Sequence, residues 1–275
     1  MNRKMKVSHI FFMFTLLAAC SADMNKNSLS IKGYDCTNIQ EHVLEHSLEE
    51  ISGICFDERN NTFLAINDEQ GIIYKLDAKT YKITDTYSFA SKGDYEEIHI
   101  LKDKLYVLRS DGKIYTMSYD GKQVSDIKSF EYDGSEEEFE SFFISAPESL
   151  VLIPKKSKRD SKQKETRGIL FNLKDGSISE SAYILSWPGL STVAKLQPSA
   201  IAIHPVSKYM YLLSSIEKRL IVLDAEWKVL EEYVLDAQRF PQPEGITFDA
   251  AANLYISNEG GDGRPALIFI PYKTK

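Results

Sequence analysis

The sequence predicts an all-β protein, a β-propeller of four-stranded blades, from three observations. A pattern repeats about every 45 residues, each copy contains up to four strand-like phrases in the same order, and the phrases become more polar from the first to the last. Repeats of this length with four strands each are typical of propeller blades. The 275 residues, of which 43% are apolar, suffice for one large domain with a full core.

The first phrase of each copy is a pair of small or acidic residues followed by an apolar strand. Its copies begin at Ser52, Glu96, Glu140, Ser199 and Glu244, which are 44, 44, 59 and 45 residues apart. Blades crowd together near the axis of a propeller, so small side chains suit the innermost strand. We therefore expect this phrase to form the innermost strand of each blade.

The second and third phrases are apolar, whereas the fourth is mixed. Second phrases begin at Thr62, Lys104, Ser149, Tyr209 and Asn253, and third phrases begin at Gly71, Lys113, Gly168, Arg219 and Ala266. The fourth phrase, as in KITDTYSF and WKVLEEYVL, alternates polar and apolar residues. This alternation suits an outermost strand with one face in solvent.

The fifth copy stops after its third strand, at Tyr272. We expect residues 41–48 to supply the missing outer strand, because pairing an N-terminal strand into the last blade closes the ring and removes exposed sheet edges. The prediction is therefore five blades. Six blades are the alternative, which needs a divergent blade around residues 176–200.

The third copy is longer because of residues 154–168, which hold seven basic residues between its second and third strands. We expect a protruding hairpin tip there. Two interpretations are open, a solvated loop or a basic finger for an acidic partner or lipid headgroups.

The N-terminus predicts secretion and lipid anchoring. Residues 1–6 are basic, and residues 10–19 form a short apolar run, which is typical of a secretory signal. The run ends in Leu-Ala-Ala-Cys, which resembles the lipobox of bacterial lipoproteins and makes Cys20 the lipidated residue; an ordinary signal peptide is the alternative. We expect a signal peptide over residues 1–19, the lipidated cysteine and a polar linker over residues 20–33, and a single propeller over residues 34–275.

This organisation predicts a location in the bacterial cell envelope, periplasmic or on the outer-membrane surface, with the membrane as a partner through the lipid. Cys36 and Cys55 then remain, either as a disulfide or as separate thiols.

The net charge of −7 falls to −10 when residues 1–19, with three basic and no acidic residues, are removed. Such a surface repels phosphate backbones and argues against nucleic acid as the main partner. We expect a monomer that binds a small molecule or a protein.

Several phrases resemble the SdiA-regulated (YjiK-like) family. They are residues 52–54, 65–77, 94–98, 243–249 and 256–259. The resemblance covers about residues 45–272 and implies a β-propeller, often in the envelope, but no particular activity. The third copy departs from the usual acidic-Gly-apolar triplet with Glu140-Ser141-Phe142. The Glu-Gly-Ile repeat is also similar to that of NHL and gluconolactonase propellers.

The candidate ligand-binding residues are the first positions of the repeat, Ser52, Glu96, Glu140, Ser199 and Glu244. If they line the mouth of the channel, Glu96, Glu140 and Glu244 face one axis, and their mutual repulsion favours a bound cation. Oxygen ligands suit Ca²⁺ or Mg²⁺. The alternative is that each glutamate caps a backbone amide in its own loop.

A second candidate group follows the second strands of the first and last blades, which adjoin when the ring closes. It consists of Asn67, Asp68, Asn258 and Glu259. Ordinary turn chemistry is the alternative for these residues.

The sequence has no G-x-S-x-G, H-E-x-x-H, P-loop or C-x-x-C motif, so the catalytic residues, if any, stay unknown. The leading hypothesis is a non-enzymatic binding module of the envelope, with Ca²⁺ at the channel mouth as a possible cofactor. One alternative is a metal-dependent hydrolase of the lactonase type, with Glu96, Glu140, Glu244 and Asn258 around the metal. The other is a structural surface protein.

Overall fold

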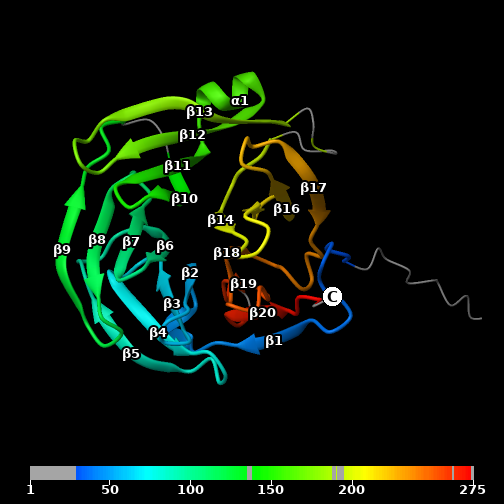
Figure 1. Ribbon diagram of the computed structural model, residues 1–275. Helices are drawn as coiled ribbons and strands as arrows, with labels where there is room; N and C mark the ends of the chain where they lie inside the picture. Colours follow the sequence, from blue (N-terminus) through cyan, green and yellow to red (C-terminus); the bar gives the residue numbers. More distant parts are fainter. Residues whose placement is uncertain (1–28, 135–137, 188–189, 191–194, 262, 274–275) are drawn as a thin grey trace, which may run out of the picture.

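The computed structural model describes residues 29–134, 138–187, 190, 195–261 and 263–273. They form five four-stranded antiparallel sheets arranged as blades around one axis (Figure 1). The predicted five-bladed propeller is confirmed. A sixth blade is not needed, because residues 178–186 form the outer strand of the third blade.

Each blade is given from its innermost strand outward. Blade 1 consists of β2 (Ile51–Asp57), β3 (Thr62–Asn67), β4 (Ile72–Asp77) and β5 (Ile83–Ser88). Blade 2 consists of β6 (Tyr95–Leu101), β7 (Lys104–Arg109), β8 (Ile114–Tyr119) and β9 (Val124–Phe130). Blade 3 consists of β10 (Glu138–Ala146), β11 (Ser149–Lys156), β12 (Glu165–Asn172) and β13 (Ile178–Ser186). Blade 4 consists of β14 (Ala200–Ile203), β15 (Met210–Ser214), β16 (Arg219–Leu223) and β17 (Val229–Val234). Blade 5 consists of β18 (Pro243–Phe248), β19 (Leu254–Asn258), β20 (Ala266–Ile270) and β1 (Gln40–Val43).

The N-terminal strand closes the last blade, as predicted. In β1, Gln40 lies opposite Phe269 and Val43 opposite Ala266 of β20. The predicted bounds were wrong at one end: the strand stops at Val43, and a 3-10 helix, η1 (His46–Leu48), follows. The turn is explained by Leu48, whose side chain is fully buried in the core.

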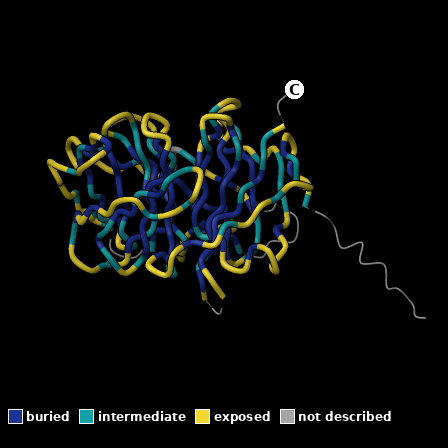
Figure 2. Tube along the Cα trace, turned by 90° about the horizontal axis from the view of Figure 1, so that it is seen from below, coloured by how far each residue is buried: buried dark blue, intermediate teal, exposed yellow. Residues whose placement is uncertain are grey.

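The core lies between neighbouring blades. One cluster, for example, joins Leu64 and Ile73 of blade 1 to Ile98 and Leu105 of blade 2. Because an inner strand has a blade on each side, β3 is buried along its whole length, whereas β9 is exposed or half-buried throughout. Figure 2 shows this as buried tube inside the ring and exposed loops on both rims. The polarity gradient of the repeat therefore follows distance from the axis.

The innermost strands touch their neighbours all around the ring. At Gly53 of β2, a Cβ atom would come within 2.6 Å of the backbone nitrogen of Ile98. At Gly245 of β18, it would come within 2.5 Å of the carbonyl oxygen of Ser52. These approaches explain why the second position of the repeat holds a small residue in most blades.

The basic hairpin of blade 3 is more ordered than expected. Between β11 and β12 the chain forms a short helix, α1 (Lys158–Gln163), rather than a bare loop. Ser157 caps it by accepting a hydrogen bond from the Asp160 backbone nitrogen at 3.3 Å. Arg167 Nε donates to the buried Asp160 Oδ1 at 2.8 Å. The hairpin therefore contains a short capped helix held at its base by an ion pair, while Lys156, Lys158, Arg159, Lys162, Gln163 and Lys164 are exposed to solvent.

Cys36 and Cys55 are both free thiols, and they pack in different core clusters. The predicted signal peptide and Cys20 lie outside the described residues. Within residues 29–273, as far as they are described, no helix has the length and apolar character needed to cross a membrane.

Candidate functional site: an acidic channel mouth

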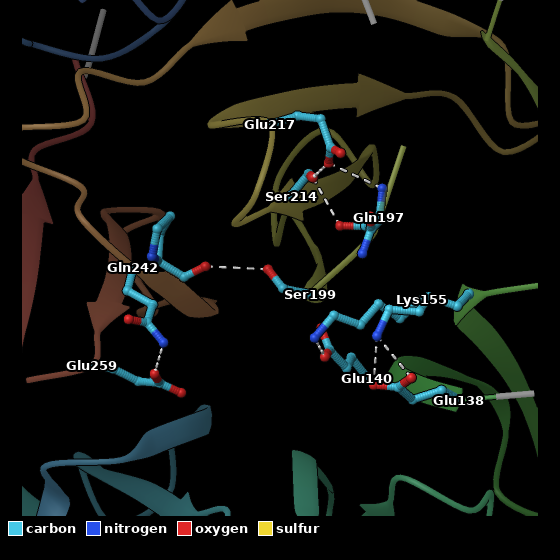
Figure 3. A network of polar contacts seen from close by, with 11 residues as sticks. Glu138, Glu140, Lys155, Gln197, Ser199, Ser214, Glu217, Gln242 and Glu259 are labelled. Atoms are coloured by element: carbon cyan, nitrogen blue, oxygen red, sulfur yellow. Dashed lines mark hydrogen bonds and ion pairs between the residues drawn. The ribbon is translucent and has the colours of Figure 1, made fainter. Parts of the chain in front are cut away.

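A cavity of about 280 Å³ lies where the innermost strands of the five blades begin. We call it the acidic mouth. The described residues that line it include eight carboxylates and a single lysine. They are Glu50, Ser52, Asp68, Asp94, Glu96, Glu138, Glu140, Lys155, Ser199, Gln242, Glu244 and Glu259. Figure 3 shows part of this network, with side chains from several blades converging.

The three glutamates of the repeat reach the mouth because of β-bulges. The register between first and second strands shifts between Tyr95 and Glu97, between Phe139 and Ser141, and between Pro243 and Gly245. Glu96, Glu140 and Glu244 are therefore the extra residues of these bulges. A bulge re-aims a side chain away from the regular alternation of a strand. Here it turns three carboxylates toward one cavity.

Two further sets of residues complete the mouth. The first set stands two positions before the repeat phrase and consists of Glu50, Asp94, Glu138 and Gln242. The second set consists of Asp68 and Glu259, which directly follow the second strands of blades 1 and 5, and of Lys155, which lies one residue before the end of β11 in blade 3. Each blade thus contributes between one and three side chains to the lining of the acidic mouth.

Burial and mutual repulsion raise the pKa values of these carboxyl groups. Desolvation, with the nearby Asp94 charge, raises the pKa of Glu96 to about 9. Desolvation and the charge of Glu244 raise the pKa of Glu259 to about 8. Burial beside Glu50 raises the pKa of Asp68 to about 6. At neutral pH the mouth therefore holds protons that ordinary surface carboxylates would have lost.

Lys155 is the positive charge of the acidic mouth. Its Nζ pairs with Glu140 Oε1 of the same blade. Its charge also opposes the rise that burial causes in the pKa values of Glu96 of blade 2 and Glu244 of blade 5. One ammonium group thus acts on carboxylates from three blades, and Figure 3 shows its pair with Glu140.

Hydrogen bonds hold other parts of the rim in place (Figure 3). Ser199 Oγ of the chain leading into blade 4 donates to the Pro243 carbonyl of blade 5 at 3.2 Å, which ties two blades together. Gln242 Nε2 donates to Glu259 Oε2. In blade 4, Ser214 Oγ bonds the Gln197 carbonyl at 2.8 Å and the carboxylate of Glu217.

The profile of the SdiA-regulated family matches residues 26–262, which is most of the chain. The chain belongs to the SdiA-regulated family. A search of curated proteins gave no match for it.

Solved structures share the fold of this SdiA-regulated chain. It is similar to a glutaminyl cyclase of Myxococcus xanthus, with 12% identity over 84% of this chain and 93% of that one and a TM-score of 0.60. It is also similar to a glucose dehydrogenase, with 10% identity over 85% and 100% of the two chains and a TM-score of 0.55. A luciferin-regenerating enzyme gives 11% identity over 85% and 95% and a TM-score of 0.54. At such identities the likeness shows the propeller fold alone.

Seven of the nine candidate residues of the SdiA-regulated chain lie in the acidic mouth. They are Ser52, Asp68, Glu96, Glu140, Ser199, Glu244 and Glu259. The other two serve their own loops instead. Asn67 Oδ1 accepts from the Gln70 backbone nitrogen at 3.0 Å, and Asn258 Nδ2 donates to the Arg239 carbonyl at 3.1 Å.

Five residues of the mouth were not among the candidates: Glu50, Asp94, Glu138, Lys155 and Gln242. Four of them share a signal that the sequence carries, because each stands two positions before the repeat phrase. Lys155 has no such signal, since its place depends on how β10 and β11 pair.

The oxygen-rich donor set suits a divalent cation such as Ca²⁺. The placement of the side chains does not form a ready cage, because no group of three or more His, Cys, Asp or Glu among the described residues is arranged to hold a metal ion. The described residues of the acidic mouth therefore concentrate negative charge but do not form a preformed set of metal ligands.

The opposite end of the channel has a different character. A cavity of about 250 Å³, which we call the apolar mouth, lies where the innermost strands end. It is lined by Cys55, Phe56, His99, Ile100, Leu101, Phe143, Ile144, Ala202, Ile203, Pro205, Thr247 and Phe248. Burial lowers the pKa of His99 to about 4, and its Nε2 lies 2.7 Å from the Phe142 carbonyl oxygen.

Glu97 is the fully buried carboxyl of the innermost strand between Glu96, which lines the acidic mouth, and His99, which lines the apolar mouth. Its Oε1 accepts from the Ile98 backbone nitrogen at 3.1 Å. Burial raises its pKa well above the usual value, although the N–H groups of Ile98 and Ile201 favour the charged form.

Proposed function

We propose that this SdiA-regulated protein is a binding module of the cell envelope whose acidic mouth holds a small cationic ligand. The observation that carries the proposal is the gathering of eight carboxylates and one lysine, from several blades, around a single cavity of about 280 Å³.

The electrostatics supports a cation as the ligand. Like charges in a partly desolvated space repel one another unless protons, basic groups or a bound cation offset them. The raised pKa values of Glu96 and Glu259 indicate that bound protons offset part of this repulsion at neutral pH. A cation that displaces those protons would gain the attraction of several carboxylates at once.

The size and lining of the cavity limit the kind of ligand. A volume of about 280 Å³ lies near the lower end for small-molecule sites, and its lining residues are charged or polar. A small, hydrophilic cation fits this description, either an organic amine or Ca²⁺. A hydrolase of the lactonase type would need a metal held by several fixed ligands, so the placement of the carboxylates favours binding over that alternative.

Envelope anchoring is part of the proposal. The signal sequence and Cys20 would place the propeller, as a monomer, at a membrane surface outside the cytoplasm. Metabolic labelling with an alkyne fatty acid should mark the wild-type protein and leave Cys20→Ala unmarked. Equal labelling of both would contradict lipidation at this residue.

Thermal unfolding with added cations tests the binding function. A ligand that binds the native state raises the melting temperature. We expect 1,4-diaminobutane or CaCl₂ to raise it at constant ionic strength, and more at pH 8.5 than at pH 6.5, because Glu259, with a pKa of about 8, loses its proton between the two.

Glu244→Gln should reduce this shift, whereas Glu148→Gln, at an exposed position outside the cavity, should leave it unchanged. If neither millimolar cation raises the melting temperature, or if both variants lower the shift equally, the acidic mouth is not a cation site.

A further inference from the structure

We propose that Lys155 competes with the ligand at the acidic mouth, because its ammonium group occupies the position that the ammonium group of the ligand takes. The ligand is therefore a primary amine, and the Lys155 side chain moves away when the ligand binds. This inference rests on the proposed cation-binding function and adds the class of ligand and the residue that controls access.

The fold places Lys155 where neighbouring blades carry acids. In blades 1 and 5, the residue after the second strand is Asp68 or Glu259, and both line the cavity. In blade 3, Phe139 lies opposite Pro154, and the next residue is Lys155. One blade of the ring therefore contributes a cation to a position that two other blades fill with carboxylates.

The contacts of Lys155 show that the mouth accommodates an ammonium group. Its Nζ pairs with Glu140, and its charge is felt by Glu96 and Glu244 across the cavity. The Lys155 side chain is only 21% exposed, and that of Glu140 only 8%. Of the carboxylates predicted for a bound cation, Glu140 thus already pairs with an ammonium group supplied by the protein, and the charge of this group acts on Glu96 and Glu244.

A second observation indicates room for another donor. Glu140 is 6% exposed as a residue and lines the cavity, yet its Oε2 is buried without a hydrogen-bond partner. A buried carboxylate oxygen left without a donor is costly. Lys155 Nζ also has three N–H donors, but its tether to the backbone leaves Oε2 without one. A ligand ammonium group has no such tether and would be free to donate to both oxygens of Glu140.

The geometry favours an amine over a metal ion. No three acidic, histidine or cysteine side chains of the described chain are arranged as metal ligands, whereas an ammonium group needs only separate acceptors around it. Lys155 stands on a flexible stem of four carbons at the rim, so it can turn toward solvent. Its departure would leave the carboxylates of blades 2, 3 and 5 to the incoming amine.

Substitution of Lys155 provides the test, with its neighbour as a matched control. Lys155→Gln and Lys156→Gln each remove one positive charge from consecutive residues. Lys156 does not line the cavity; it pairs at 3.0 Å with Glu138, which does, but both side chains of this pair are half-exposed, so that solvent screens the charge of Lys156. Lys155→Arg keeps the charge in place. Urea unfolding of each variant confirms that it is folded before binding is measured.

Calorimetric titration at pH 8 uses methylammonium, tetramethylammonium and CaCl₂ as probes. We expect Lys155→Gln to bind methylammonium about tenfold more tightly than the wild type, since an opposing charge within the site has been removed. Lys156→Gln and Lys155→Arg should stay within about threefold of the wild type. Tetramethylammonium, which has no N–H donor, should gain little in any variant.

The outcomes separate this inference from the proposed function. If the wild type binds cations and Lys155→Gln binds them no better than Lys156→Gln does, the competitor role is wrong while the cation site stands. If only Lys155→Gln binds methylammonium, the competitor role stands and the wild-type binding function fails. A gain for CaCl₂ or tetramethylammonium equal to that for methylammonium would overturn the assignment to amines. Failure of every protein to bind any probe would overturn both proposals.

Discussion

The two ends of the propeller channel are built from the same five strands but differ in chemistry. The acidic mouth, where the strands begin, is lined by carboxylates whose burial raises their pKa values. The apolar mouth, where the strands end, is lined mainly by aliphatic and aromatic side chains, and its His99 is held neutral by burial.

One end of the channel therefore stabilises the fold, whereas the other end destabilises it. Apolar side chains at the end of the strands bury surface and pack between blades. Carboxylates at the beginning of the strands are desolvated and repel one another, which opposes folding unless protons or cations neutralise them. Sites of the second kind are candidates for function because their cost is recovered on binding.

The largest expected effect lies at the apolar mouth. Phe248 is 8% exposed, and its ring packs 5.0 Å from that of His204 and 5.1 Å from that of Tyr211. Phe248→Ala should lower the free energy of unfolding by about 3 kcal/mol, because it leaves a cavity in the core. Urea unfolding measures the loss.

Amine binding by Phe248→Ala should stay within about twofold of the wild type, since the substitution leaves every charge of the acidic mouth in place. Loss of amine binding in this folded variant would show that the two mouths are coupled rather than separate.

A smaller effect of opposite sign is expected at the acidic mouth. The pKa of Glu96 is raised to about 9, so its contribution to stability is fully present below the unfolded value of about 4.5 and is lost as the pH rises toward 9. Glu96→Gln removes this loss and should raise the free energy of unfolding by about 1 kcal/mol at pH 8. This is well below the linkage value for an isolated group, because the neighbouring carboxyl groups of the mouth take up protons in its place.

The pH dependence makes the sign of the Glu96 effect testable. Near pH 4 the glutamate is protonated in both states, and the gain from Glu96→Gln should vanish. Urea unfolding at the two pH values measures it, with Glu148→Gln as the exposed control. A loss of stability at pH 8, or a gain that is the same at both pH values, would contradict the electrostatic account of the mouth.

The fold could be predicted because its determinants are local and repeated. Four strand-like phrases of fixed order, spaced by short turns, specify a blade, and the missing fourth phrase of the last copy predicted the closure by the N-terminal strand. The error at residues 44–48 has a tertiary cause, since Leu48 turns inward to fill a gap that the sequence does not reveal.

The candidate site could be predicted only in part. Ser52 and Glu244 were found because they hold the same place in successive repeats. Asp94 and Glu138 share a second such place, which a longer alignment of the repeat would have revealed. Lys155 was assigned to a basic hairpin and instead faces the carboxylates.

The amino-acid sequence alone specified the blades and the residue types at each strand start, because the pattern of apolar and polar residues along a chain selects strands and their order. It predicted five blades with six as the alternative, and the pairing of residues 178–186 as the outer strand of blade 3 settled the number. Three features became apparent only in the folded protein. The β-bulges turn Glu96, Glu140 and Glu244 toward one cavity. Lys155 lines the same cavity, and the other end of the channel is apolar. The physical reason is that desolvation and charge repulsion belong to groups brought together from distant parts of the chain, and no stretch of sequence contains them until the ring has closed.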